Sequence, residues 1–160
     1  MKLLIMFFSM FLDILLVNIF RFTGYNISYF YPMFTISSVV YISNYYLHYN
    51  RKNYYFIVLL ISIIYDTLSV NNLIITIPLF LLIAYLNIKL RKNFKTNLFN
   101  NIIFLIISIL IYDLGFHLLL VLVKYQELNL VRLFYKFTHS LIINVIYIIV
   151  MFLVLKRKKA

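Results

Sequence analysis

The sequence predicts an all-α protein: a polytopic bundle of about six transmembrane helices forming one membrane domain over residues 1–160, with both termini cytoplasmic. Three observations support this prediction. Hydrophobic residues make up 65% of the chain and charged residues only 12%, whereas soluble domains average about 45–50% apolar and about 25% charged residues. The apolar residues fall into six runs. The Lys and Arg residues between these runs are divided unequally between the two sides of a membrane crossed six times.

Each run is long enough, or nearly long enough, to cross a bilayer as a helix. A helix rises about 1.5 Å per residue, so roughly 20 apolar residues cross a hydrocarbon layer of about 30 Å. The predicted spans are residues 3–20, 29–47, 54–70, 73–88, 98–123 and 133–155. The first run is interrupted by Asp13 and is followed by no small-residue cleavage site, which favours a retained helix over a cleaved signal peptide.

Local residues indicate how the later spans begin, bend and pack. Only Asn71 and Asn72 separate the third span from the fourth, which predicts a tight helical hairpin. Pro78 in the short fourth span predicts a kink or a thinned bilayer. Gly115 in the long fifth span marks a bend or a close helix contact. Because the chain has no G-x-x-x-G motif, serines are the expected small residues at helix contacts. They are Ser37, Ser38, Ser62, Ser69 and Ser108.

Positive charge sets the predicted orientation. Eleven of the 15 Lys and Arg residues lie on the side that holds both termini, and four lie on the other side. Because basic residues are retained on the cytoplasmic side during insertion, both ends are expected inside the cell and membrane lipids are the expected surroundings. The basic tail at 156–159 fits a stop-transfer anchor, with contact to anionic lipid as the alternative. The net charge of +11 is therefore not interpreted as a nucleic-acid-binding face.

Three of the four acidic residues fall inside predicted spans. Asp13, Asp66 and Asp113 each lie past the middle of an odd-numbered span, toward the outer leaflet. A carboxylate at the centre of a membrane helix costs about 2.5–3.5 kcal/mol or more, so such residues usually face protein or a wet cavity. One interpretation is a shared polar site for protons, cations or a cationic substrate. The favoured interpretation is separate hydrogen bonds between helices, with Asp66 close to the free N–H groups that begin the fourth helix.

His117 lies one helical turn after Asp113, so the two side chains can meet on one helix face. A buried hydrogen-bonded pair is the favoured interpretation, and a proton relay or metal pair is the alternative. One acid and one histidine do not make a metal site. The chain has no Cys, no phosphate-binding loop and no motif of a nucleophilic or zinc-dependent hydrolase. The sequence therefore predicts no cofactor, no metal and no catalytic residue.

A spaced set of residues marks the second to fourth spans. In chain order it consists of Pro32, Tyr41 nine residues later, Ser62, Asp66, Ser69 and Tyr85. In this pattern residues 29–88 resemble the MreD family of bacterial rod-shape-determining membrane proteins. That family has a Gly-Leu-x-x-Asp helix, a hairpin and a span that ends in Gly/Ala-Tyr-Leu. Ser62 stands here in place of the family's glycine, so a helix contact made through that glycine is not expected in the same form.

The resemblance implies a non-enzymatic subunit of the bacterial cell-shape complex, which organises lateral peptidoglycan synthesis at the cell (inner) membrane. It also implies partners: an MreC-like bitopic protein and, through it, an MreB-like filament and a RodA-type wall synthase. Two other functions stay open. A six-helix substrate-binding subunit of a vitamin-type transporter needs a buried pocket near Asp66 and Asp113. An intramembrane aspartyl hydrolase, similar in length to lipoprotein signal peptidase, needs those two acids for turnover.

Overall fold

The structure, a computed structural model, describes residues 2–22, 32–47, 50–70, 75–94, 96–124, 127 and 129–157. Over this part of the chain it is helical and contains no strand, so the predicted all-α class is confirmed there. The elements are α1 (Lys2–Phe22), α2 (Phe34–Tyr46), α3 (Arg51–Tyr65), the π-helical turn η2 (Asp66–Val70), α4 (Thr76–Arg91), α5 (Leu98–Leu122) and α6 (Leu130–Arg157).

Two helices are long and apolar enough to cross a membrane. They cover Leu98–Leu122 and Leu130–Leu155, and their most apolar stretches have mean hydropathies of 2.4 and 2.3. Leu3–Ile19 is a shorter apolar helix. Crossing by the other helices stays a prediction.

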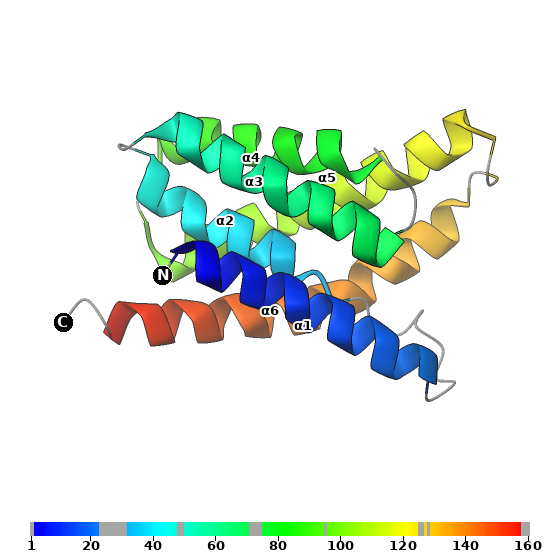
Figure 1. The fold of residues 1–160 in the computed structure, drawn as a ribbon, viewed down its shortest axis with the longest axis horizontal. Coiled ribbons are helices and arrows are strands. Elements are labelled where there is room, and N and C mark those ends of the chain that lie inside the picture. The colour runs from blue at the N-terminus through cyan, green and yellow to red at the C-terminus, as the bar shows by residue number, and fades with distance from the viewer. Residues whose placement is uncertain are drawn as a thin grey trace.

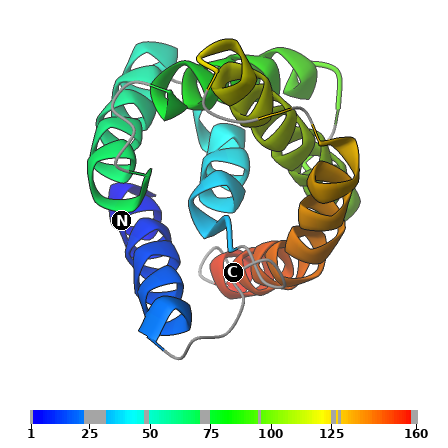
Figure 2. The ribbon, with the colours of Figure 1, turned by 90° about the vertical axis from the view of Figure 1, so that its right-hand side faces the viewer.

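The helices alternate in direction and surround α2. α1, α3 and α5 run one way along the bundle and α2, α4 and α6 run back, so α1 begins and α6 ends at the same end (Figure 1). Viewed from one end, α2 lies in the centre with the other helices around it (Figure 2). It contacts all five of them. The ten residues from Phe34 to Ser43 are all buried. A helix that is enclosed on every side needs residues that tolerate burial on all of its faces, and α2 has such residues.

The second predicted span was wrong at its start. Pro32 and Met33 lie outside the helix, which begins only at Phe34, while residues 29–31 lie outside the described part. The physical reason is that the backbone N–H groups at this point bond to side chains of other helices, as described below. The helix has 13 residues, or about 20 Å of rise, which is less than a hydrocarbon layer of about 30 Å.

Pro78 and Gly115 help to place α4 beside α5. Pro78 lies in the first turn of α4, where an N–H has no intrahelical acceptor, so the proline helps to begin the helix. α4 continues from there to Arg91 and needs no break at the proline. A Cβ added at Gly115 would lie 2.5 Å from Cδ2 of Leu79. Of the two roles predicted for Gly115, the structure therefore has the close helix contact.

The predicted small residues at helix contacts are buried where their side chains are described. The hydroxyls of Ser37, Ser38, Ser62 and Ser108 donate to backbone carbonyl groups three or four residues earlier, at 2.7–3.2 Å. The Ser108 hydroxyl also accepts a hydrogen bond from Asn87 Nδ2 of α4, at 2.9 Å. These small side chains therefore bond locally and allow neighbouring helices to approach closely. The side chain of Ser69 and the predicted Asn71–Asn72 hairpin lie outside the described residues.

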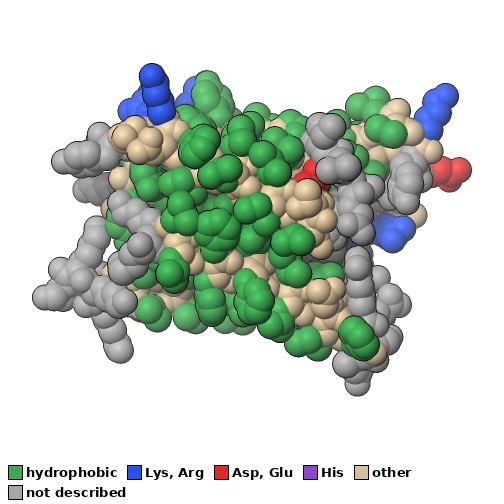
Figure 3. Space-filling view, viewed as in Figure 1, with side chains coloured by type: hydrophobic (Ala, Val, Ile, Leu, Met, Phe, Trp, Pro, Cys, Tyr) green, Lys and Arg blue, Asp and Glu red, His purple; other side chains and the backbone are tan. Residues whose placement is uncertain are grey.

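Apolar side chains cover the outside of the bundle as well as its core. Figure 3 shows hydrophobic side chains across the middle of one face, with Lys and Arg side chains at its two ends. Phe11, Leu118 and Ile142 are examples of large exposed hydrophobic residues, on α1, α5 and α6. A water-soluble monomer rarely exposes apolar area of this extent. The surface fits a chain whose middle is surrounded by lipid.

Candidate functional site

The N-terminus of α2 is bonded to side chains from α1 and α6. The carboxylate of Asp13 accepts hydrogen bonds from the backbone N–H groups of Phe34 and Thr35, both at 2.8 Å, and from the Thr35 hydroxyl at 2.5 Å. Asn144 Oδ1 accepts from the N–H of Met33 at 2.9 Å. The first N–H groups of a helix have no intrahelical acceptor and form the positive end of its dipole, so a carboxylate is well matched there.

Asp13 therefore has a structural role between helices. Its side chain is fully buried, and both of its oxygens accept hydrogen bonds from α2. This agrees with the interpretation that an intramembrane acid bonds to a neighbouring helix. These hydrogen bonds also explain why α2 begins at Phe34. The Asp13 carboxylate accepts from the first N–H groups of the helix, which have no acceptor within the helix.

Asp113 of α5 forms an ion pair with Lys136 of α6. The Lys136 Nζ lies 2.9 Å from Asp113 Oδ1, and the two side chains are 29% and 1% exposed. The same ammonium group lies 5.7 Å from the centre of the Phe116 ring. The charge on Asp113 is therefore balanced by Lys136, which lies near the beginning of the predicted sixth span.

His117 lines the same pocket as Asp113, as their spacing predicts. This pocket has a volume of about 160 Å³ and also contains Arg132 and Lys136. His117 Nε2 accepts a hydrogen bond from the backbone N–H of Asn129 at 3.2 Å. The predicted hydrogen bond between Asp113 and His117 is not formed, because neither carboxylate oxygen of Asp113 accepts a hydrogen bond from a described residue and His117 bonds to Asn129 instead. The part of the chain that the structure describes has no group of three or more His, Cys, Asp and Glu residues placed to hold a metal ion.

Breaking the Asp113–Lys136 pair from the two sides is expected to have unequal effects. Lys136→Gln leaves a buried carboxylate unpaired, which costs about 3–5 kcal/mol. Asp113→Asn costs less, because the partly exposed Lys136 chain can move its ammonium toward water. The double variant should resemble Asp113→Asn alone, so the coupling energy should equal the cost of Lys136→Gln, about 3–5 kcal/mol. Unfolding of the four proteins in mild detergent measures the cycle, and additive effects would show that the pair does not contribute.

Arg91, the last residue of α4, is a buried cation bonded to neutral oxygens. Its guanidinium donates to Asn44 Oδ1, to the Val40 carbonyl at 2.7 Å and to Asn101 Oδ1 at 2.8 Å. It also lies 4.7 Å from the centre of the Phe104 ring. Only 1% of the residue is exposed, and its Nε has no hydrogen-bond partner among the described residues. Burial lowers the pKa of the Arg91 guanidinium to about 10, so the group stays charged at neutral pH.

No acidic side chain of the described structure pairs with Arg91. All four acidic residues of the sequence lie in the described part, and the ion pair found there is the one between Asp113 and Lys136. The cation is instead bonded to the Val40 carbonyl at the middle of α2 and to the side chain of Asn44 one turn later. α2 is thus bonded to an anion at its N-terminus and to a cation in its C-terminal half.

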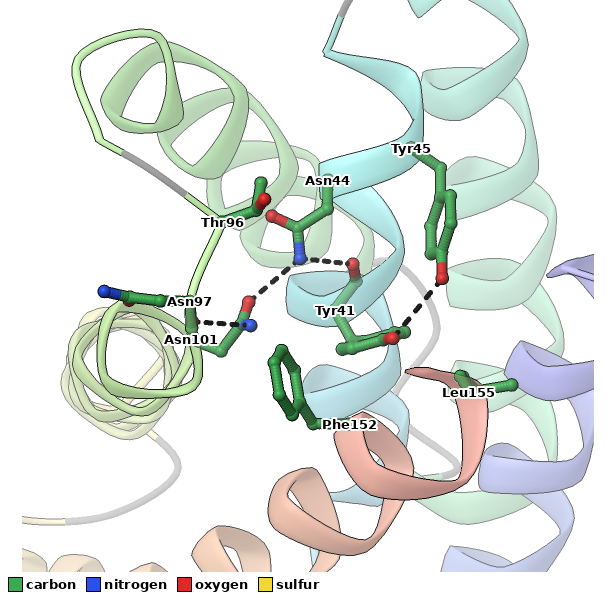
Figure 4. Close-up of a pocket in the computed structure, with 8 residues that line it drawn as sticks. All are labelled: Tyr41, Asn44, Tyr45, Thr96, Asn97, Asn101, Phe152 and Leu155. Carbon is green, nitrogen blue, oxygen red and sulfur yellow. Dashed lines mark hydrogen bonds between the residues drawn. The ribbon is translucent and has the colours of Figure 1, made fainter. Parts of the chain in front are cut away.

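A polar pocket lies beside this cluster, between α2, the segment before α5, and α6 (Figure 4). Its volume is about 290 Å³. Asn44 Nδ2 donates to Asn101 Oδ1 at 2.9 Å, and the hydroxyls of Tyr41 and Tyr45 lie 3.3 Å apart. The pocket is lined by Tyr41, Asn44, Tyr45, Thr96, Asn97, Asn101, Phe152 and Leu155. It shares no lining residue with the pocket at Asp113.

The residues of the family-like pattern occupy several parts of the bundle. Pro32 is buried just before α2, and Tyr41 is buried within it. Asp66, 1% exposed, is the first residue of η2. Tyr85 is 52% exposed on α4 and therefore faces away from the core. Ser62 and Ser69 are as described above.

Sequence reasoning missed the polar residues that bond helices together most extensively. In the sequence Arg91 stands out only as one of the basic residues that set the orientation, and no asparagine inside a predicted span is among the predicted site residues. The available signal was an amide inside a long apolar run, since polar groups in a membrane span usually face protein. The missed amides are Asn44, Asn87, Asn101 and Asn144.

Comparison with protein-family models, with curated proteins and with solved structures finds no match to this chain.

Proposed function

We propose that this chain is a non-enzymatic subunit of a membrane-protein assembly, and that the assembly is the bacterial cell-shape complex implied by the MreD resemblance. The observation that carries the proposal is how the buried charges are used. Asp13 caps α2, Asp113 pairs with Lys136 across α5 and α6, and Arg91 bonds α4 to α2 and α5. Charged groups that bond one helix to another stabilise a rigid bundle, and this use favours a structural role over a catalytic one.

The arrangement of the helices supports six spans with both ends inside. α1 begins and α6 ends at one end of the bundle (Figure 1), as an even number of crossings requires. Five described basic residues lie at that same end, where α3 begins and α4 ends: Arg51, Lys52, Lys89, Arg91 and Lys92. The short α2 fits this proposal because other helices surround it, and a short helix in a membrane must be enclosed by protein.

A bundle of this kind has few surfaces with which to bind partners. Most described residues are helical, and the helices carry exposed apolar side chains. Partners therefore bind its lipid-facing flanks or its ends. An MreC-like bitopic protein fits the first mode, since its single span can pack against such a flank. An MreB-like filament and a RodA-type synthase would associate with this chain indirectly, through the MreC-like protein.

The two rival functions have less support. A vitamin-type substrate site usually needs about 300–1,000 Å³, and the pocket at Asp113 has about 160 Å³. Aspartyl hydrolysis needs two carboxylates at one reacting centre, whereas the described partner of Asp113 is Lys136. The transporter alternative would be favoured by tight binding of a vitamin-sized ligand. The hydrolase alternative would be favoured if Asp66→Asn or Asp113→Asn abolished a turnover while leaving the fold intact.

Topology and co-purification test the proposal together. A reporter fused after Arg157 is expected to be active only inside the cell, and one inserted near Glu127 only outside. Tagged protein extracted in mild detergent is expected to bring down an MreC-like protein, and its depletion to round the cells. Asp66→Ala is expected to lower membrane accumulation or this co-purification. Activity of the Arg157 reporter outside the cell would contradict the topology. Normal cell shape after depletion would contradict the cell-shape function. Normal accumulation and co-purification of Asp66→Ala would contradict the role proposed for Asp66.

A further inference from the structure

We propose that the pocket beside Arg91 binds a phosphate-bearing anion, and that its natural occupant is the headgroup of an anionic membrane lipid. The first argument is charge. Arg91 is buried and charged, its described partners are neutral oxygens, and none of the four acidic residues of the chain pairs with it. A buried charge that lacks an opposite charge attracts one strongly when the medium between them is of low dielectric.

The second argument is the path from the cation to the pocket. Arg91 bonds to the side chains of Asn44 and Asn101, and both of these side chains line the pocket. The guanidinium is therefore one side chain removed from the pocket space. Tyr41 and Thr96 add hydroxyl groups to the lining, and such groups donate to phosphate oxygens. The Phe152 ring closes one side of the same space (Figure 4).

The third argument, which rests on the proposed membrane topology, concerns the source of the anion. The pocket lies where α2 ends, α5 begins and α6 approaches its end, which is the predicted cytoplasmic end of the bundle. Anionic lipids are concentrated in the cytoplasmic leaflet, and clustered basic residues recruit them. Lys89 and Lys92 flank Arg91 on the same segment. A lipid phosphate is therefore available at this depth, and dissolved phosphate shares its chemistry.

The test measures thermal unfolding of the purified chain in a neutral detergent. Three additives are titrated separately: phosphatidylglycerol, zwitterionic phosphatidylcholine and inorganic phosphate. Phosphatidylglycerol is expected to raise the melting temperature at a concentration roughly tenfold lower than phosphatidylcholine does, as one uncancelled charge at short range predicts. Stabilisation by phosphatidylglycerol alone identifies a lipid headgroup site. Equal stabilisation by inorganic phosphate keeps the anion site and overturns the lipid as its occupant.

Three matched substitutions locate the effect. Thr96→Glu puts a tethered carboxylate at the pocket from an exposed position, so the preference for phosphatidylglycerol should be lost. Thr96→Gln has the same shape without the charge and should keep the preference. Asn53→Glu adds the same charge at an exposed position in the first turn of α3, outside the lining, and should also keep it.

A further substitution, at a residue that bonds directly to the guanidinium, tests the role of Arg91. Asn101→Asp supplies the missing carboxylate beside the guanidinium, so the lipid preference should also disappear in this variant. If all variants respond like the unaltered chain, or if the two lipids act equally on it, the pocket is not an anion site. These measurements need no partner protein, so their failure is separate from a failure of the cell-shape proposal.

Discussion

Asp13→Ala is expected to remove most of the folded protein that detergent extracts from the membrane. The substitution leaves the N–H groups of Phe34 and Thr35 without their described acceptor in a fully buried place. Each such group costs roughly 1–3 kcal/mol, against a total stability of about 5–15 kcal/mol for many proteins. The loss also falls on α2, which contacts every other helix. Fluorescence-detected gel filtration and thermal unfolding measure the effect.

Graded variants separate capping from general damage to α1. Asp13→Asn keeps one acceptor oxygen and should be intermediate between the unaltered chain and Asp13→Ala. Thr35→Val removes only the hydroxyl bond to the carboxylate and should cost about 1.5–3 kcal/mol. Asn18→Ala changes an exposed polar residue of the same helix and should have little effect. If Asp13→Ala unfolds at the same temperature as Asn18→Ala, the carboxylate does not hold α2.

Arg91→Leu is expected to have the second large effect. It removes the donors to Val40, Asn44 and Asn101, and so breaks the described bonds of α4 to both α2 and α5. The side-chain oxygens that lose a charged donor stay buried or half-buried, and each hydrogen bond to a charged group contributes about 1.5–3 kcal/mol. We expect a lower melting temperature and faster proteolysis near the α4–α5 connection.

Two controls define what Arg91 contributes. Arg91→Lys keeps the positive charge but replaces the planar fork with a single ammonium, so it should recover only part of the stability. Lys92→Leu removes the same charge from the adjacent, exposed position and should leave the melting temperature nearly unchanged. Equal destabilisation by Arg91→Leu and Lys92→Leu would mean that loss of charge at this end, rather than the buried bonds, causes the effect.

The apolar runs of the sequence located most helices well because each helix is a continuous stretch of apolar residues. The predicted fifth span, residues 98–123, and sixth span, residues 133–155, match α5 and most of α6 closely. The prediction failed at the start of α2, where the run continues through Pro32 and Met33 but the helix does not. An apolar run shows where a helix is allowed. It does not show where other parts of the chain satisfy the first N–H groups.

The candidate site was less predictable because its partners are far apart in sequence. Asp13 bonds to residues 21 and 22 positions away, and Arg91 bonds to Val40 across 51 positions. Asp113 was recognised as a buried acid, but Lys136 was seen only as a charge near a span end. His117 lies at the same pocket as Asp113, because that proximity depends on helix geometry alone, but the hydrogen bond expected between them is not formed.

By itself the sequence determined the helical class, the apolar exterior and the unequal distribution of basic residues, because each depends on composition or on spacing along one helix. Only the tertiary structure decided that α2 is central and which groups bond to its two halves. The reason is physical: a buried charge is stabilised by whatever lies within hydrogen-bond distance in space, and in this bundle those groups come from different helices.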